Sequence, residues 1–200
     1  MADILATQRL LLREIMPADI VVLQAIFGDE TCMRYYPAVK TLEETTAWFQ
    51  KLAFDSYALH GFGLWAVIDR QSGALIGDCG ITLQRTSSGL EPEIGYHFLH
   101  DVWGRGFATE AASACRDYAF HALGFSRVVS IVAADNIGSQ RVAAKVHDRC
   151  ETSVRTDPTT GRVVERSLYI SERLRPTTAN AAGDAARGTV SSAVTSRDSS

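Results

Sequence analysis

The chain has 200 residues, a formal net charge of −3 and 46% hydrophobic residues, which is the composition of one folded globular domain. The slightly acidic balance argues against general nucleic-acid binding, which needs a basic surface. No apolar run approaches the roughly 20 residues of a membrane span, and the N-terminus lacks the features of a signal peptide. The four cysteines form no Cys-x-x-Cys pair, so we expect a cytoplasmic protein with reduced thiols.

Alternating apolar residues and turn residues predict the elements of the first half of the chain. A strand over residues 8–14 precedes a helix from residue 17 to about 27. Thr41 and Glu44 have the spacing of a capping box, so a second helix is expected to begin there. Three strands of an antiparallel meander follow, over residues 63–69, 74–83 and 92–99.

The second half continues with small residues at helical spacing, which predict a helix over residues 108–122. A strand over residues 125–133 and a helix over 139–146 come next, and then a hairpin of residues 151–155 and 162–170 with its turn at 157–161. We place the domain at residues 1–175. Residues 176–200 contain no Leu, Ile, Met, Phe, Trp, Tyr or Cys, so we expect a disordered tail.

The most informative segment is a glycine loop between the strand that ends at residue 99 and the helix that follows. Gly104 and Gly106 lack a Cβ atom, so an anion can approach the main chain and the positive end of the helix. The loop is not a P-loop, because no Gly-x-x-x-x-Gly-Lys-Ser/Thr run is present. It is not a dinucleotide fingerprint either, because Thr109 stands where the third glycine belongs.

Residues 103–111 resemble motif A of the GNAT superfamily of acyl-CoA-dependent N-acetyltransferases. That motif reads Gln/Arg-x-x-Gly-x-Gly/Ala, and Trp103, Gly106 and Ala108 take its first, fourth and sixth places. The run Trp-Gly-x-Gly-Phe-Ala-Thr-Glu-Ala is typical of the RimJ/RimL-type branch, which acetylates protein N-termini and other amines. Other segments that match this branch, in its order, are residues 7–13, 75–80, 93–96 and 136–145.

The resemblance implies the fold: an α/β (α+β) protein with a single GNAT domain. Its sheet would be mixed, mostly antiparallel and twisted, with helices on its faces and with the fourth and fifth strands splayed. The resemblance also implies acetyl-CoA as co-substrate, an amine as acceptor, and no metal. A protein or peptide α-amine is the default acceptor, and a small polyamine or an amine antibiotic is the alternative.

The resemblance also assigns the residues that would hold acetyl-CoA. The pantetheine arm would pair with Phe98 and Leu99, and the main-chain N–H of Leu99 would polarise the thioester carbonyl. Asn136 would hydrogen-bond the pantetheine, although a helix cap is its other reading. The pyrophosphate would lie on the loop residues Trp103, Gly104, Arg105, Gly106, Phe107, Ala108 and Thr109.

For the chemistry, Glu93 is the candidate general base and His97, on the same strand face, is the second. A structural ion pair and a structural histidine are the competing readings of these two residues. Ser139 matches a position near the coenzyme sulfur and could donate to the thiolate, with a helix start as its other reading. Many GNAT enzymes carry a tyrosine acid four residues later, where this chain has Ala143.

Other functional classes fit less well. A metal hydrolase would need His97 and His100 to ligate together, yet alternation on a strand points them to opposite faces. A serine hydrolase would need Gly-x-Ser-x-Gly, which is missing. A non-catalytic acyl-CoA-binding protein is the main alternative.

Glu110 is assigned no chemistry, since its place in the first turn of a helix explains it. The acceptor and the oligomeric state stay open, with Arg34, Tyr35, Tyr36, Trp48 and Trp65 as possible lining residues.

Overall fold

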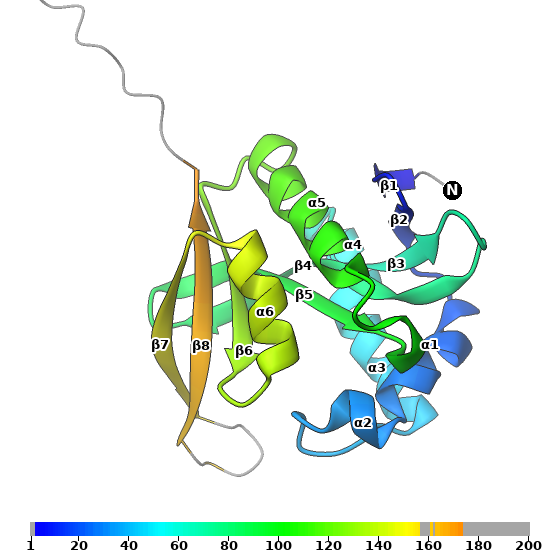
Figure 1. Cartoon of the computed structure of the whole chain (residues 1–200), viewed down its shortest axis with the longest axis horizontal. Coiled ribbons are helices and arrows are strands. Elements are labelled where there is room, and N and C mark those ends of the chain that lie inside the picture. The colour runs from blue at the N-terminus through cyan, green and yellow to red at the C-terminus, as the bar shows by residue number, and fades with distance from the viewer. Residues whose placement is uncertain (1–2, 157–160, 162, 174–200) are drawn as a thin grey trace, which may run out of the picture.

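A computed structural model describes residues 3–156, 161 and 163–173. Within these ranges one sheet of eight strands has the order β1-β2-β3-β4-β5-β6-β8-β7. Neighbouring strands are antiparallel except for β5 and β6, which are parallel. The predicted mixed, mostly antiparallel sheet is therefore confirmed (Figure 1).

The element boundaries follow the expected pattern closely. The strands are β1 Asp3–Ala6, β2 Leu10–Glu14, β3 Leu64–Asp69, β4 Leu75–Thr86, β5 Gly89–Phe98, β6 Arg127–Ala133, β7 Arg149–Thr156 and β8 Val163–Glu172. The helices are α1 Asp19–Phe27, α2 Glu30–Met33, α3 Leu42–Phe49, the π-helical turn η1 Gln50–Phe54, α4 Asp55–His60, the 3₁₀ turn η2 His100–Val102, α5 Phe107–His121 and α6 Ile137–Val146.

Two short elements had no sequence signal. Strand β1 has four residues and lies at the edge of the described sheet, next to β2. Helix α2 is a single turn capped by Asp29, whose side chain accepts from the N–H of Cys32. The predicted capping box is present: Thr41 accepts from Glu44 N at 3.2 Å, and Glu44 accepts from Thr41 N at 2.8 Å. Most of the predicted turn at 157–161 and the whole of the predicted tail at 176–200 lie outside the described residues.

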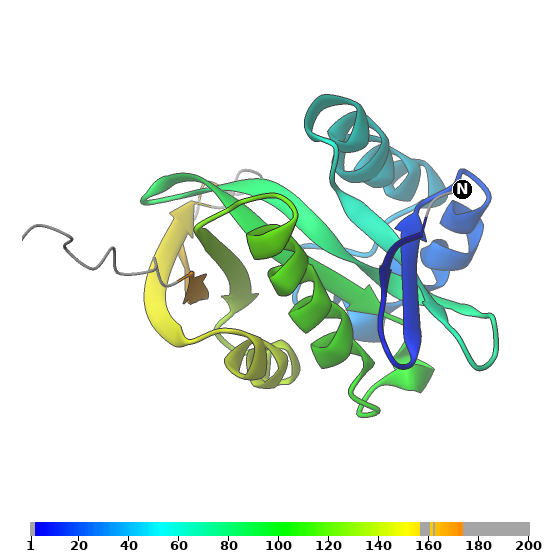
Figure 2. The same ribbon diagram turned by 90° about the horizontal axis from the view of Figure 1, so that it is seen from above.

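Helices cover both faces of the sheet, and Figure 2 shows the sheet between them. Strand β3 contributes to both cores, because its successive side chains alternate in direction. Trp65 and Val67 face α5, whereas Leu64 and Ala66 face α1 and α3. The face of α5 against the sheet consists of small residues that are at most 1% exposed, namely Ala111, Ala112, Cys115 and Ala119.

The predicted splay lies between β5 and β6. The two strands share a single register pair, Glu93 with Val129, and they separate beyond it toward the carboxyl end of β5. Main-chain groups on that edge of β5 consequently lack strand partners from β6. The fold thus opens its own sheet at one place, next to the glycine loop at the start of α5.

Glu110 anchors the first turn of α5 to the connection between β1 and β2. Its carboxylate accepts from the Thr7 hydroxyl at 2.6 Å, the Arg9 N–H at 2.9 Å and the Arg9 guanidinium at 2.6 Å. Partial burial opposes the charged form, but the hydrogen bonds from Thr7 and Arg9 outweigh it and lower the pKa of Glu110. The side chain is therefore structural, in keeping with the absence of an assigned chemistry.

We expect Glu110→Gln to lower the free energy of unfolding by about 1–3 kcal/mol at pH 7, because several charge-assisted hydrogen bonds are lost. A carboxyl group whose pKa is lowered in the folded state stabilises the folded protein at pH values above its unfolded pKa of about 4.3. This stabilisation is lost as the pH falls through the folded-state pKa. The difference from wild type should therefore shrink in urea titrations at pH 3. Glu43→Gln on the exposed side of α3 is the control, and an equal loss at both pH values would contradict the charge argument.

Candidate active site

Two cavities open where β5 and β6 separate. The loop cavity, of about 460 Å³, lies between the glycine loop, the end of β5 and the first turns of α6. The sheet cavity, of about 490 Å³, is bounded by the segment after α2, by α3 and by strands β4, β5, β6 and β8. Six residues line both cavities, and we call this set the junction: Tyr35, Tyr36, Tyr96, His97, Asn136 and Ser139.

The glycine loop has the geometry of an anion cradle. Gly104 has φ +73° and Gly106 has φ +82°, a left-handed conformation that favours glycine. Gly106 is the N-cap of α5, and its carbonyl accepts the first main-chain bond of the helix from Glu110 N at 3.1 Å. The N–H groups of residues 107–109 thus precede the helical ladder, at the positive end of a 15-residue helix.

Side chains around the loop fix its shape. The Arg9 guanidinium donates to the Arg105 carbonyl at 2.9 Å and lies 4.6 Å from the centre of the Phe107 ring. The Arg105 side chain lies 4.9 Å from the same ring. Trp103 donates its Nε1 hydrogen to the Phe98 carbonyl at 2.8 Å, so it ties the loop to the last residue of β5. This bond gives a structural reason for tryptophan at the first motif position.

The predicted role of the Leu99 N–H is wrong. It donates to the Ile76 carbonyl of β4 at 3.0 Å, so it faces the neighbouring strand and not the gap. In an antiparallel ladder the next residue points its N–H and carbonyl the other way. The main-chain groups of Phe98 therefore face the side of β6, as its carbonyl bond to Trp103 confirms.

Asn136 and Ser139 form the start of α6. The Asn136 side-chain oxygen accepts from Ser139 N at 3.0 Å, so this asparagine is the helix N-cap. The Ser139 carbonyl accepts from the Tyr96 hydroxyl at 3.0 Å, which links α6 to β5 across the gap. The structural readings of both residues are therefore present, and both residues also line the two cavities.

Glu93 lines the sheet cavity at the point where the strands separate. Its Oε1 atom accepts from Ile131 N on β6 at 3.3 Å, two residues beyond the only β5–β6 register pair in the described sheet. It supplies the sole carboxylate among the described residues that line this cavity. Its position therefore fits a base for a group bound there.

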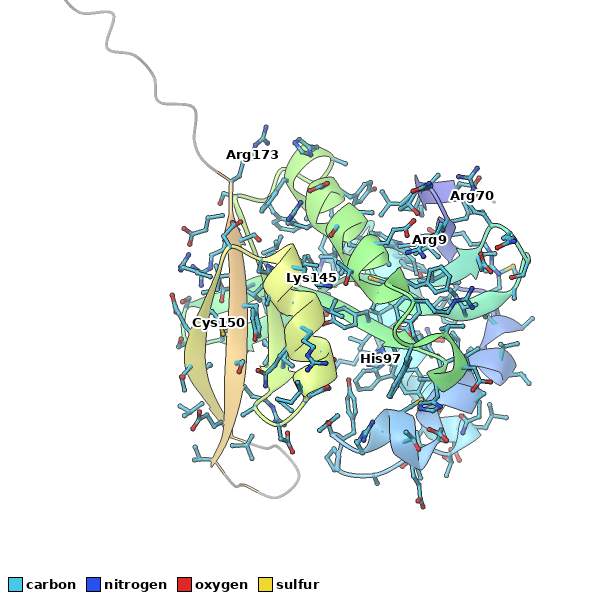
Figure 3. All side chains as sticks on the ribbon, in the orientation of Figure 1. Arg9, Arg70, His97, Lys145, Cys150 and Arg173 are labelled. Atoms are coloured by element: carbon cyan, nitrogen blue, oxygen red, sulfur yellow. The ribbon has the colours of Figure 1, made fainter. Side chains whose placement is uncertain are left out.

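His97, which Figure 3 labels, lies at the junction. Both of its ring nitrogens have hydrogen-bond partners. Nδ1 is 3.0 Å from Asp78 Oδ1, and Nε2 is 2.7 Å from the Tyr36 hydroxyl. Burial disfavours the charged ring, but Tyr36 and Asp78 outweigh it and raise the pKa of His97 to about 10. Both ring nitrogens already have partners, and the raised pKa disfavours an unprotonated ring at neutral pH, which argues against His97 as the second base.

Two basic residues of the loop cavity were missed by the sequence reasoning. Arg141 and Lys145 of α6 line the cavity together with Arg34, and Figure 3 labels Lys145 on that helix. The four-residue spacing of Arg141 and Lys145 was the available signal, since it places both on one helix face. With the free N–H groups of the loop, these cations give the cavity the donor set that phosphates require.

Among the possible lining residues, one expectation needs correction. Trp65 lines neither cavity: it is 1% exposed and its ring lies edge-on to Tyr118 at 5.5 Å. Arg34 belongs to the loop cavity, whereas Trp48 lines the sheet cavity. Ala143 is 1% exposed and packs in a cluster with Val132 and Tyr169, so its position does not face the junction.

A buried histidine holds the end of α6. His147 follows the last residue of the helix, is 8% exposed, and contacts the hydroxyls of Ser130 at 3.0 Å and Ser171 at 3.1 Å. Burial and the nearby Arg116 lower the pKa of His147 to about 4, so the ring is neutral near pH 7. The helix end is therefore regular and held by a buried polar network.

Over the described ranges, no helix is long and apolar enough to cross a bilayer. The same residues contain no group of three His, Cys, Asp or Glu side chains suited to a metal ion.

Comparison with known proteins assigns the chain to a family. The model of the acetyltransferase (GNAT) domain matches residues 9–147. An uncharacterized protein of Bacillus subtilis, YkkB, is 32% identical over 166 residues, which cover 82% of this chain and 96% of YkkB. An acetyltransferase structure from Agrobacterium tumefaciens is 27% identical with a TM-score of 0.72, and the match covers 84% of this chain and 94% of that one.

A more distant structure shares the fold. The ribosomal-protein-S5-alanine acetyltransferase of Vibrio fischeri has a TM-score of 0.65 at 17% identity, over 84% of this chain and 95% of its own. The family match and the relatives that are named as acetyltransferases favour an enzyme over the alternative of a non-catalytic acyl-CoA-binding protein of the same fold. The chain belongs to the GNAT acetyltransferase family and is an acyltransferase that uses acetyl-CoA as its co-substrate.

Proposed function

We propose that the protein acetylates a primary amine that enters the sheet cavity, using acetyl-CoA held in the loop cavity. The observation that carries this proposal is the junction, where six residues line both cavities. Two substrates bound on opposite sides of the junction would meet there, as direct transfer requires. The favoured acceptor is the α-amine of a protein or peptide, as in the RimJ/RimL-type branch.

The loop cavity has donors suited to coenzyme A. Main-chain N–H groups of residues 104–109 would hold the pyrophosphate, and the cations Arg34, Arg141 and Lys145 would offset its charge. Phe98 would pair with the pantetheine through its main chain. Asn136 has its side-chain oxygen committed to the helix cap, so its amide hydrogens would serve as the donors.

The charges of the sheet cavity favour a peptide over a polyamine. Glu93 is the carboxylate among its described lining residues, which also include Lys51 and Arg166. A polyamine carries several positive charges, which the two cations would repel and which a single carboxylate would not balance. An acceptor with one amine and with carbonyl or carboxylate groups nearby matches this pattern better. The acceptor of the Vibrio fischeri neighbour, a ribosomal-protein alanine, is of this kind.

In the proposed reaction the neutral amine nitrogen attacks the thioester carbonyl carbon, and the carbon–sulfur bond then breaks. Glu93 takes the proton that the amine loses. The Phe98 N–H faces the gap and would donate to the oxygen that becomes negative, in the role expected of Leu99. Ser139, in the first turn of α6, would donate a hydrogen bond toward the departing sulfur.

The direct test is calorimetric titration of the full chain with acetyl-CoA, with acetate and ATP as controls. Saturable binding in the roughly micromolar to millimolar range would support the loop cavity as the cofactor site. Release of free thiol is then followed with peptides of varied N-terminal residue and with spermidine. Peptide-dependent release is expected, whereas release with spermidine alone would overturn the peptide assignment.

We expect Gly106→Asp to weaken acetyl-CoA binding by about 100-fold or more, because the new carboxylate would lie against the pyrophosphate. Gly73→Asp is the matched control, since Gly73 has φ +72° in the β3–β4 turn and lines neither cavity. Both variants should lose similar stability through the left-handed backbone, but only one should lose affinity in calorimetry. Equal affinity in both would remove the phosphate assignment.

We expect Glu93→Gln to lower kcat about 100-fold while leaving the affinity for acetyl-CoA unchanged, since a general base contributes roughly 10²–10⁴-fold. The loss should be greatest below neutral pH, where the acceptor amine is protonated and depends on the base. Glutamine keeps an oxygen for the Ile131 N–H, so the strand contact at 3.3 Å is preserved. Glu165→Gln on the exposed side of β8 is the control, and an unchanged pH–rate profile would exclude Glu93 as the base.

A further inference from the structure

We infer that the Tyr36 hydroxyl is the acid that protonates the coenzyme A thiolate. His97, itself held by Asp78, positions this hydroxyl and supplies its next proton. The inference rests on the proposed function and names the group that replaces the missing tyrosine at Ala143. It follows from a chain of hydrogen bonds that ends at the junction.

Three segments supply the chain of hydrogen bonds. Asp78 lies on β4, His97 lies opposite it on β5, and Tyr36 lies in the connection between α2 and α3. The distances are 3.0 Å from Asp78 Oδ1 to His97 Nδ1 and 2.7 Å from His97 Nε2 to the Tyr36 oxygen. A buried carboxylate thus orients a histidine, and the histidine contacts a hydroxyl that lines both cavities.

The buried carboxylate of Asp78 keeps the proton on His97. Asp78 is 0% exposed, and its Oδ2 atom has no hydrogen-bond partner among the described residues. An isolated buried carboxylate is costly, so it favours a positive ring beside it. The raised pKa of His97, about 10, agrees with this geometry. The charged ring then donates from Nε2 to the Tyr36 oxygen, which leaves the hydroxyl hydrogen of Tyr36 for another acceptor.

The alternative donors at the junction are less suitable. Tyr96 donates its hydroxyl hydrogen to the Ser139 carbonyl at 3.0 Å, and burial raises the pKa of Tyr96. The Ser139 hydroxyl is an alkyl alcohol, which gives up a proton far less readily than a phenol. The Tyr36 hydroxyl makes no hydrogen bond in the described structure besides that to His97.

Aromatic packing holds the two rings in place. The His97 ring lies 4.9 Å from that of Phe27 on α1 and 6.3 Å from that of Trp48 on α3. Trp48 also lies edge-on to Tyr36 at 6.3 Å. These apolar rings pack around His97, whereas Tyr36 is 36% exposed, so solvent can return a proton to the relay.

The protons balance in the step. As the carbon–sulfur bond breaks, its electron pair goes to sulfur, and the Tyr36 hydrogen moves to sulfur to give the thiol. Tyr36 regains a proton from His97 Nε2. His97 is reprotonated from solvent, to which Glu93 releases the proton taken from the amine.

The first test needs no acceptor. Coenzyme A is bound to the protein, and the pKa of its thiol is measured from the ultraviolet absorbance of the thiolate. We expect a value below the roughly 8.5 of an ordinary thiol in the wild type, and a rise of about one pKa unit, a tenfold change in ionisation, in Tyr36→Phe. Tyr118→Phe on α5, outside both cavities, should match the wild type.

Equal thiol pKa values in Tyr36→Phe and wild type, with coenzyme A bound to both, would overturn the relay and leave the proposed function intact. A wild type that does not bind coenzyme A would overturn both. With an accepted amine, Tyr36→Phe should lower kcat about 100-fold and change KM less than about twofold, as loss of a general acid predicts. An equal loss in Tyr118→Phe would indicate a structural effect and would also overturn the relay.

The positioning role of His97 is tested by His97→Gln, which keeps a donor for Tyr36 but removes the charge. The titratable groups that contact His97 are Asp78 and Tyr36, and its other ring contacts are Phe27 and Trp48. We expect the wild-type kcat to fall as the pH rises through about 10. In His97→Gln we expect kcat to be lower at every pH and to show no such fall. Nitrogen NMR of the free protein should show a charged His97 ring at pH 7, and a neutral ring would contradict the relay.

Discussion

The separation of β5 from β6 is the constraint on which the rest of this structure depends. After the pair of Glu93 with Val129, the strands stop sharing a ladder, and the main chain of β5 loses its neighbour. Unpaired backbone in a protein interior is costly, so side chains satisfy part of it. The Ser130 hydroxyl donates to the Ile94 carbonyl at 2.8 Å, and Trp103 donates to the Phe98 carbonyl at 2.8 Å.

A buried network maintains this opening from the side of β6. Because Ser130 donates to Ile94, its oxygen is the acceptor for His147 Nε2 at 3.0 Å, which places the ring hydrogen on Nε2. His147 Nδ1 then accepts from the Ser171 hydroxyl on β8. The lowered pKa of His147, about 4, keeps this network neutral across the physiological range. The chain thus uses a neutral histidine for structure and a charged one, His97, at the junction.

On the other side, the loop and the helix start depend on β1 and β2. Arg9 donates to the Arg105 carbonyl at 2.9 Å and pairs with Glu110 at 2.6 Å, so a residue far from the loop in sequence fixes the loop's backbone. The left-handed glycines at 104 and 106 can then direct N–H groups into the loop cavity without strain. Glu110 therefore supports the glycine loop by holding Arg9, which fixes the backbone of the loop, and it is assigned no contact with the ligand.

The sequence by itself determined most of the elements and the loop, because these depend on local periodicity, turn chemistry and the motif around Gly104 and Gly106. The mixed sheet followed from the resemblance that this motif carries. The sequence also indicated Glu93 by its place on a strand. Only the tertiary structure decided which way the Leu99 N–H points, since ladder register is set by the partner strand. It likewise decided that Trp65 is core and that both ring nitrogens of His97 have partners, because both depend on residues distant in the chain: Tyr118, Tyr36 and Asp78. Burial and pairing are properties of neighbours in space, and the sequence lists only neighbours along the chain.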